Sequence, residues 1–247
     1  MIKIINLVKS FGGHKVLDGI NLELPTGQIT VVIGKSGVGK SVLLKHIIGL
    51  VKPDSGQILV DDQDISLLRG SSLRKFKQRI AVLFQGGALF DSHSVFENIA
   101  FPLREKTRLP EDEIAKRVRT RLAQMSLASE VEAKFPDELS GGMKKRVALA
   151  RAMIQEPEIM FFDEPVTGLD PPMTNTVFHL ISKTHQESGY TALMVSHDIP
   201  EVFSVAHQVA ILHKGRIIAA GTPGEIQSHA DPVVQSFIRG EVDFLED

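Results

Sequence analysis

Residues 34–41 read Gly34-Lys35-Ser36-Gly37-Val38-Gly39-Lys40-Ser41. They follow the apolar run 29–33, which predicts a buried strand, and they precede residues 41–50, whose pattern predicts a helix. The glycines allow the backbone to curl so that successive N–H groups face phosphate oxygens, and the helix adds the positive end of its dipole. This strand, loop and helix predict a nucleotide site in an α/β fold.

Two residues of the loop and two carboxylates further along the chain suggest phosphoryl chemistry. Lys40 is expected to reach the β- and γ-phosphates as a point charge, and the Ser41 hydroxyl is expected to ligate Mg²⁺. Asp163 and Glu164 end the apolar run 159–162, where an unpaired buried charge would be costly. We therefore expect Asp163 to hold Mg²⁺ and Glu164 to polarise the water that attacks the γ-phosphate.

Two further polar residues follow predicted strands. His197 comes after the run 191–196, and Gln85 comes after the run 80–84. Short apolar runs that alternate with helical patterns predict a largely parallel sheet, in which strand ends meet at the ligand-binding edge. His197 could contact the γ-phosphate and orient Glu164, and Gln85 could sense Mg²⁺ or water. The structural alternatives are a packing histidine and a polar loop residue.

The stretch Leu139-Ser140-Gly141-Gly142 precedes a predicted helix at about 143–154. Such a helix start with two glycines predicts a second anion site. Because the chain's own nucleotide is already cradled by residues 34–41, the nucleotide of a second copy is the natural ligand, in a head-to-tail homodimer. The alternative is that Ser140 is an ordinary N-cap. The basic residues at 144–146 are expected to form a solvated helix face.

Composition limits the remaining possibilities. The chain has 247 residues, 43% of them apolar and 23% charged, which suits one α/β domain with a helical insertion. A net charge of −2 argues against nucleic-acid binding, and the absence of cysteine excludes disulfides and cysteine-based zinc sites. Neither a signal-peptide pattern nor a run of about 18 apolar residues occurs, so we expect a cytoplasmic protein that needs a partner for any membrane role.

The middle of the chain has a helical pattern from about 94 to 155. Ile114, Val118, Leu122 and Met125 recur at near-helical spacing and predict one buried stripe. The dense charges at 104–121 predict a solvated face, with a partner-docking surface as the alternative. Further along, the runs 209–212 and 216–219 predict a hairpin with a glycine in its turn.

Together these motifs resemble the ATPase subunits of ABC transporters over essentially the whole chain. The matching features are Walker A at 34–41, the Q-loop at Gln85, the signature at 139–142, Walker B ending in Asp163, the D-loop with Asp170 and the switch histidine His197. The resemblance implies one domain over 1–247: a P-loop core with a mainly parallel sheet, an N-terminal antiparallel β-subdomain, a helical subdomain at about 94–156 and a tail at about 229–247.

The same resemblance implies the roles of individual residues. The catalytic group would be Glu164, His197, Lys40 and Gln85, and Mg²⁺ would be held by Ser41, Gln85 and Asp163. ATP would be bound by Gly34, Lys35, Ser36, Gly37, Val38, Gly39, Lys40, Ser41, Val42, Phe11 and Val16. The residues Leu139, Ser140, Gly141 and Gly142 would act on the ATP of the partner chain.

Two positions need separate comment. Phe11 stands where the family usually has an aromatic ring that stacks on adenine, with Val16 in support; the alternative is a core residue at a strand end. Met143 stands where the family commonly has glutamine, and a methionine cannot make the polar contacts of that side chain.

Residues 83–90, 101–105 and 139–146 resemble, more narrowly, the ATPases of MCE-type lipid transporters such as the bacterial Mla system. That resemblance implies phospholipid movement between membranes, a permease pair, an MCE-domain lipid-binding protein and a small STAS-domain subunit on the helical subdomain. It places the chain peripherally on the inner membrane through the permease. It also suggests that residues 237–247 grip the neighbouring ATPase.

Several rival functions stay open. Another cargo, such as an amino acid, a solvent or a drug, is the first. A non-transport ABC ATPase acting on DNA or ribosomes would need a coiled-coil insertion or two ATPase units, and neither pattern is present. A small-molecule kinase would have a similar phosphate loop but no use for residues 139–142.

Overall fold

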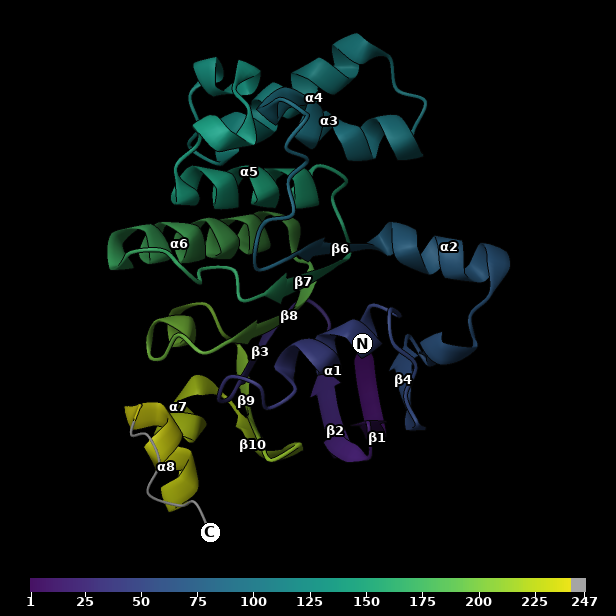
Figure 1. The fold of residues 1–247 in the computed structure, drawn as a ribbon, viewed down its shortest axis with the longest axis vertical. Coiled ribbons are helices and arrows are strands. Elements are labelled where there is room, and N and C mark those ends of the chain that lie inside the picture. The colour runs from purple at the N-terminus through teal and green to yellow at the C-terminus, as the bar shows by residue number, and fades with distance from the viewer. Residues whose placement is uncertain (241–247) are drawn as a thin grey trace.

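The computed structural model describes residues 1–240, which form two sheets with helices packed around them (Figure 1). The smaller sheet is antiparallel, with strand order β2-β1-β4-β5. Its strands are β1 Ile2–Phe11, β2 His14–Leu24, β4 Ser55–Val60 and β5 Gln63–Asp64. This is the N-terminal antiparallel β-subdomain that the resemblance implied.

The larger sheet has strand order β10-β9-β3-β8-β7-β6. Its strands are β3 Ile29–Ile33, β6 Ile80–Leu83, β7 Ile159–Asp163, β8 Thr191–Ser196, β9 Gln208–His213 and β10 Arg216–Gly221. All pairs are parallel except the β9–β10 hairpin. Every residue of β3 and β8 is buried, which explains why these strands appear as continuous apolar runs in the sequence.

Helices surround both sheets. Those beside the sheets are α1 Lys40–Ile47, α2 Gly70–Arg79, α6 Pro171–Ser188, α7 Pro223–Gln227 and α8 Pro232–Arg239. Short 3₁₀ turns occupy Ile65–Leu67, Ser129–Ala133, Pro136–Glu138 and Glu201–Ser204. Within residues 1–240, no helix is both long and apolar enough to cross a bilayer.

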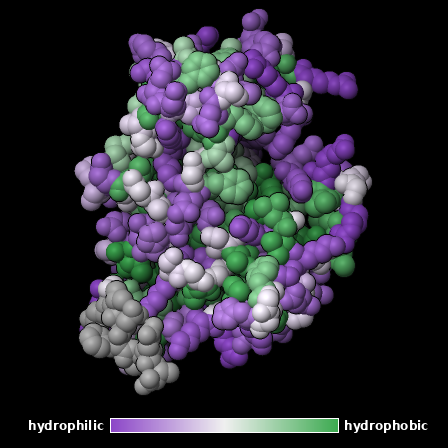
Figure 2. All heavy atoms as spheres, viewed as in Figure 1, coloured by the Kyte–Doolittle hydropathy of each residue, from purple (hydrophilic) through white to green (hydrophobic). Residues whose placement is uncertain are grey.

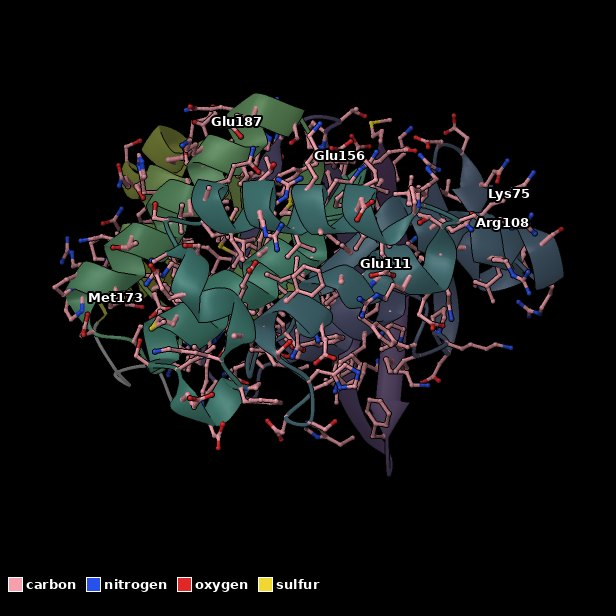
Figure 3. The ribbon with its side chains drawn as sticks, turned by 90° about the horizontal axis from the view of Figure 1, so that it is seen from above. Lys75, Arg108, Glu111, Glu156, Met173 and Glu187 are labelled. Carbon is pink, nitrogen blue, oxygen red and sulfur yellow. The ribbon has the colours of Figure 1, made fainter. Side chains whose placement is uncertain are left out.

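Three helices form a separate layer at one end of the molecule: α3 Val95–Lys106, α4 Glu111–Gln124 and α5 Gly141–Met153 (Figure 1). A capping box starts α3, because the Ser94 hydroxyl accepts the Glu97 amide and the Glu97 carboxylate accepts the Ser94 amide. The predicted stripe of α4 is confirmed: its apolar residues are buried. Figure 3 shows the layer from above, with Arg108 and Glu111 among its charged side chains.

The structure corrects two sequence predictions and describes only part of a third, the C-terminal tail. The helix expected to reach residue 50 ends at Ile47. The charged face of α4 is not wholly solvated, because Arg121 is only 9% exposed. Of the expected tail, residues 232–239 form α8, whose Val234 is fully buried, and residues 241–247 lie outside the described part of the chain.

The central sheet divides the core in two. Val31 of β3 belongs to the cluster that faces the helical layer, whereas the next residue, Val32, belongs to the cluster shared with α1 and the antiparallel sheet. Alternate residues of a strand point to opposite faces, so β3 contributes to both clusters. The phosphate loop that follows β3 therefore starts from a strand that is fixed on both sides.

The chain's one tyrosine, Tyr190, offers a test of this core. Its ring is 2% exposed, its hydroxyl donates to the Ile181 carbonyl at 3.1 Å, and burial raises its pKa to about 12. The folded state therefore holds this proton more tightly than the unfolded state, in which a phenol ionises near about pH 10. The stability contributed by this group is complete below about pH 10 and is lost as the pH rises toward 12.

We expect the native chain to show little phenolate absorbance at about pH 11, where most of the tyrosine in the urea-unfolded chain is ionised. Because no other tyrosine and no tryptophan is present, the absorbance reports this group alone. Phenolate that forms near about pH 10 with the circular dichroism unchanged would contradict the burial of Tyr190.

Candidate functional site

The phosphate loop is closed around the side chain of Lys40. The Lys40 ammonium donates to the carbonyls of Gly34 at 2.8 Å and Lys35 at 3.0 Å, and the residue is 4% exposed. Burial lowers the pKa of Lys40, and the carboxylates of Glu164 and Asp163 act in the opposite direction. The loop thus holds one cation at the start of α1, where the helix N-terminus adds partial positive charge.

Two loop glycines are needed for their geometry. Gly39 precedes α1 with φ 110°, a region that side chains other than hydrogen disfavour. Gly34 passes so close to β9 that an added Cβ would lie 2.4 Å from the Leu212 carbonyl oxygen. The loop can therefore leave β3 in this direction only if residue 34 has no side chain.

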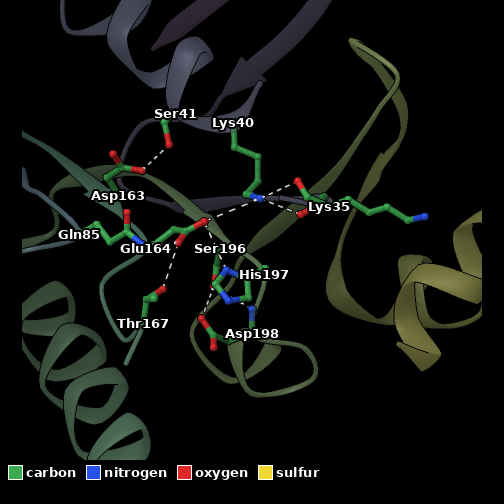
Figure 4. Close-up of polar contacts among 11 residues, drawn as sticks. Lys35, Lys40, Ser41, Gln85, Asp163, Glu164, Thr167, Ser196, His197 and Asp198 are labelled. Carbon is green, nitrogen blue, oxygen red and sulfur yellow. Dashed lines mark hydrogen bonds and ion pairs between the residues drawn. The ribbon is translucent and has the colours of Figure 1, made fainter. Parts of the chain in front are cut away.

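Ser41 and Asp163 meet at the carboxyl edge of the sheet. The Ser41 hydroxyl donates to Asp163 Oδ1 at 2.9 Å, which brings the start of α1 to the end of β7 (Figure 4). A hydroxyl and a carboxylate are oxygen ligands of the kind that Mg²⁺ takes, and Mg²⁺ typically uses one or two carboxylates together with phosphate oxygens and water. In the described residues no group of three or more histidine, cysteine or acidic side chains is placed to hold a metal ion.

Glu164 is the centre of the polar network in Figure 4. Its Oε2 accepts from Gln85 Nε2 at 3.0 Å and from Thr167 Oγ1 at 3.1 Å. Its Oε1 lies 3.3 Å from His197 Nδ1 and 3.8 Å from Lys40 Nζ. The side chain is only 14% exposed, so these four neighbours determine where its carboxylate points.

The backbone also fixes Glu164. Its φ is 47°, in the left-handed region, and its amide donates to the Val195 carbonyl of β8 at 3.0 Å. A residue other than glycine in this region costs roughly 1–2 kcal/mol, and such conformations concentrate at functional sites. The turn after β7 is thus strained in a way that aims the Glu164 side chain at the phosphate loop.

A short turn after β8 positions His197. The Ser196 hydroxyl donates to Asp198 Oδ2 at 2.9 Å, and the Asp198 amide donates back to that hydroxyl at 3.1 Å. The imidazole of His197 is 47% exposed and reaches Glu164 from the solvent side. Sequence reasoning placed Gln85, Glu164 and His197 at one edge of the sheet, and the structure brings them into contact.

Two residues of the network were missed. Thr167 lies three residues beyond Glu164, a spacing that could have suggested a turn in which it contacts the carboxylate. Lys145 donates to the Gln85 carbonyl and is 7% exposed. The prediction that residues 144–146 form a solvated face was therefore wrong, because Lys145 is buried and the Arg146 guanidinium donates to the Ser126 carbonyl at 2.8 Å.

The signature residues lie apart from this network. None of the contacts described above involves residues 139–142. Ser140 caps α5, its hydroxyl accepting the Met143 amide at 3.3 Å, and it remains exposed. The Met143 side chain is partly buried and packs against the hydrophobic core. Asp170 likewise caps α6, accepting the Met173 amide at 2.8 Å.

Phe11 and Val16 lie on either side of the β1–β2 turn. Phe11 is 47% exposed, so the alternative that it is a core residue was wrong. The Lys9 ammonium lies 5.3 Å from the centre of the Phe11 ring, within cation–π range. Val16 touches the phosphate loop, because its carbonyl would lie 3.2 Å from a Cβ added to Gly39.

An apolar groove separates α2 and β6 from the helical layer. Two adjoining pockets of about 830 and 500 Å³ share Ile80, Val82, Phe84, Glu105 and Lys106 in their lining. Figure 2 shows apolar side chains gathered across this part of the surface. Leu50, Phe84 and Phe90, which line it, are between 37% and 61% exposed.

A buried parallel sheet with a phosphate-binding loop at its carboxyl edge is the architecture of the P-loop nucleoside triphosphatases. Residues 17–167, more than half of the chain, match the family described as ABC transporter. The chain is 41% identical to the "Intermembrane phospholipid transport system ATP-binding protein MlaF" of Haemophilus influenzae over 98% of its own length and 92% of that protein. MlaF of Escherichia coli K12 is also 41% identical, over 94% of this chain and 86% of that protein. The chain belongs to the ABC transporter family.

Solved structures agree with this assignment. A "dimeric structure of a post-hydrolysis state of the ATP-binding cassette MJ0796 bound to ADP and Pi" is similar with a TM-score of 0.82 and 30% identity. The similarity covers 90% of this chain and 99% of that one. The fold expected from the sequence is thereby confirmed, and the chain is an ATPase of this family.

The close approach of the phosphate loop to β9 leads to a prediction. Gly34→Ala should lower the free energy of unfolding by about 1–3 kcal/mol, because its methyl group meets the Leu212 backbone carbonyl, which cannot move alone. Gly224→Ala, on α7, is the control, since nothing lies within 4 Å of an added Cβ there. Chemical denaturation of both variants measures the difference. Equal stability would mean that the loop does not pass β9 as described.

Proposed function

We propose that this chain is the ATP-hydrolysing subunit of a membrane transporter, in which Glu164 activates the attacking water. The observation that carries this proposal is the position of the Glu164 carboxylate, held between Lys40 of the phosphate loop and His197. A carboxylate fixed beside the γ-phosphate position is what a general base needs, since geometry comes before pKa.

The roles of the other site residues follow from their contacts. Gly34, Lys35, Ser36, Gly37, Val38, Gly39, Lys40, Ser41 and Val42 form the loop and helix start that would bind the phosphates. When ATP binds, the Lys40 ammonium would donate to β- and γ-phosphate oxygens in place of the carbonyls of Gly34 and Lys35. Ser41 and Asp163, with the side-chain oxygen of Gln85, would hold Mg²⁺, which when bound neutralises charge on the phosphates.

Three residues would control the position of Glu164 during turnover. Gln85 and Thr167 hold Oε2, which leaves Oε1, on the side of His197 and Lys40, to accept a proton from water. His197 would contact the γ-phosphate and keep that oxygen oriented. At the other end of the nucleotide, the exposed ring of Phe11 would stack on adenine, and Val16 would support the same ring.

The exposure of Ser140 and Gly141 in the signature suggests a dimer. Leu139, Ser140, Gly141 and Gly142 present a helix N-terminus that is not used by the chain's own phosphate loop. We infer that they complete the ATP site of a second copy, and that Asp170 lies at the same interface. The dimeric form of the similar MJ0796 cassette supports this arrangement.

The apolar groove is the site where we expect a permease helix to dock. It is bordered by Phe84 and Phe90, which lie on either side of Gln85 in the sequence. A helix bound there would therefore be displaced when residues 84–90 move. This arrangement would keep the chain on the cytoplasmic side of the inner membrane, attached through its permease. Because the net charge is −2, we do not expect this chain to bind nucleic acid.

For the cargo, the MlaF relatives favour phospholipid moved between membranes. An MCE-domain lipid-binding protein and a small STAS-domain subunit would complete such a system. Purification with the membrane partners, followed by identification of the bound solute, tests the cargo. Finding an amino acid, a solvent or a drug would replace phospholipid as the proposed cargo.

We also propose that residues of about 94–156 act as the helical subdomain of a single domain over 1–247, with a tail from about 229.

Glu164→Gln should lower turnover by about 10²–10⁴-fold while ATP still binds, because the amide cannot accept a proton but keeps the shape of the side chain. Release of phosphate from γ-labelled ATP measures turnover, and filter binding measures affinity. Glu158→Gln is the control, since that carboxylate is exposed and pairs with Arg79. Undiminished turnover would remove Glu164 from its role.

The same assay separates the ATPase from a kinase. A transporter ATPase releases the γ-phosphate to water, whereas a small-molecule kinase would release little until an acceptor is added. Acceptor-dependent transfer would therefore replace the proposed function.

A further inference from the structure

One face of helix α5 holds the segment that carries Gln85. Lys145 donates to the Gln85 carbonyl, and Arg151 donates from Nη2 to the Gly87 carbonyl at 2.9 Å. Between these two contacts, a Cβ added to Gly87 would lie 3.3 Å from the Cβ of Ala148. Residues 145, 148 and 151 are spaced by three and therefore share one side of the helix. The segment after β6 thus lies directly on α5.

Lys145 is an unusual residue for such a contact. Its side chain is buried, at 7% exposure, and burying an ammonium is costly unless a partner compensates. Burial lowers the pKa of Lys145, and the negative charges of Glu164 and Asp198 act in the opposite direction. The Gln85 carbonyl supplies the hydrogen-bond acceptor. A residue that served only to extend α5 would not need a charge at this position.

The contact connects two sites that are otherwise separate. At one end, α5 begins with the signature and its cap, Ser140. At the second site, the side chain of Gln85 donates through Nε2 to the Glu164 carboxylate at 3.0 Å. Lys145 holds the Gln85 backbone from the helix that starts at the signature. A movement of α5 would therefore reach Glu164 through the segment that carries Gln85, and Lys145 is the α5 side chain that holds the Gln85 carbonyl itself.

We propose that Lys145 is a positioning residue that links the orientation of the signature helix to the Gln85–Glu164 contact, so that hydrolysis is fast only when α5 is correctly placed. This inference rests on the proposed role of Glu164. Lys145 touches neither nucleotide nor water in this scheme, and its effect passes through Gln85.

The test is a double-mutant cycle on the full chain. Lys145→Met, which removes the charge and keeps the length, should lower kcat about tenfold and change the KM for ATP less than twofold. In a Gln85→Ala background the same change should lower kcat by less than twofold, because the link to Glu164 is already cut. Lys145→Arg, which keeps the charge and donors, should retain most of the turnover.

Controls separate this role from a merely structural one. Lys144→Met removes the neighbouring ammonium, which has no hydrogen bond or ion pair among the contacts of residues 1–240, and it should leave kcat unchanged. Thermal melts check folding, and if Lys145→Met does not fold, Lys145→Ala, which has no donor for the Gln85 carbonyl and suits a helix, replaces it in the cycle.

Equal losses in the two backgrounds, or no loss beyond that of Lys144→Met, would overturn the proposal. That result differs from a failure of the proposed function, which would appear as normal turnover in Glu164→Gln.

Discussion

The Glu164 carboxylate is the group on which the rest of the site depends. Its neighbours come from four parts of the chain. Lys40 belongs to the phosphate loop, Gln85 follows β6, Thr167 lies in the turn just after Glu164 itself, and His197 follows β8. Parallel strands make this convergence possible, because their carboxyl ends meet at one edge. The strained φ of 47° at Glu164 is maintained because residues 159–162 of β7 are buried and the neighbouring β8 is buried throughout.

Much of this arrangement could be predicted from the sequence. The strand Ile29–Ile33 has the bounds that its apolar run suggested, and the phosphate loop follows it as expected. Gln85, Glu164 and His197 were correctly placed at one edge because each follows an apolar run. Fully buried parallel strands and a glycine-rich loop leave strong local patterns, and the sheet topology then brings the strand ends together.

Other features could not be predicted, for physical reasons. Lys145 lies in a basic run that resembles a solvated helix face, and its burial depends on a backbone carbonyl that is distant in sequence. Arg121 is buried at the end of a charged helix for a similar reason of tertiary packing. Phe11 could have been a core residue, and only the structure shows that its ring is exposed beside Lys9. Local pattern does not determine which polar side chains the tertiary fold buries.

The central claim is that the signature of one copy completes the ATP site of another. Because the chain has no cysteine, Ser36→Cys can be placed in one copy and Ser140→Cys in a second, differently tagged copy, both carrying Glu164→Gln. Mixed with Mg·ATP and a mild oxidant, the two copies should form a disulfide between chains, and the disulfide should be absent without nucleotide. A bond that never forms between the two tags, or that forms only when both cysteines are in the same chain, would contradict the account.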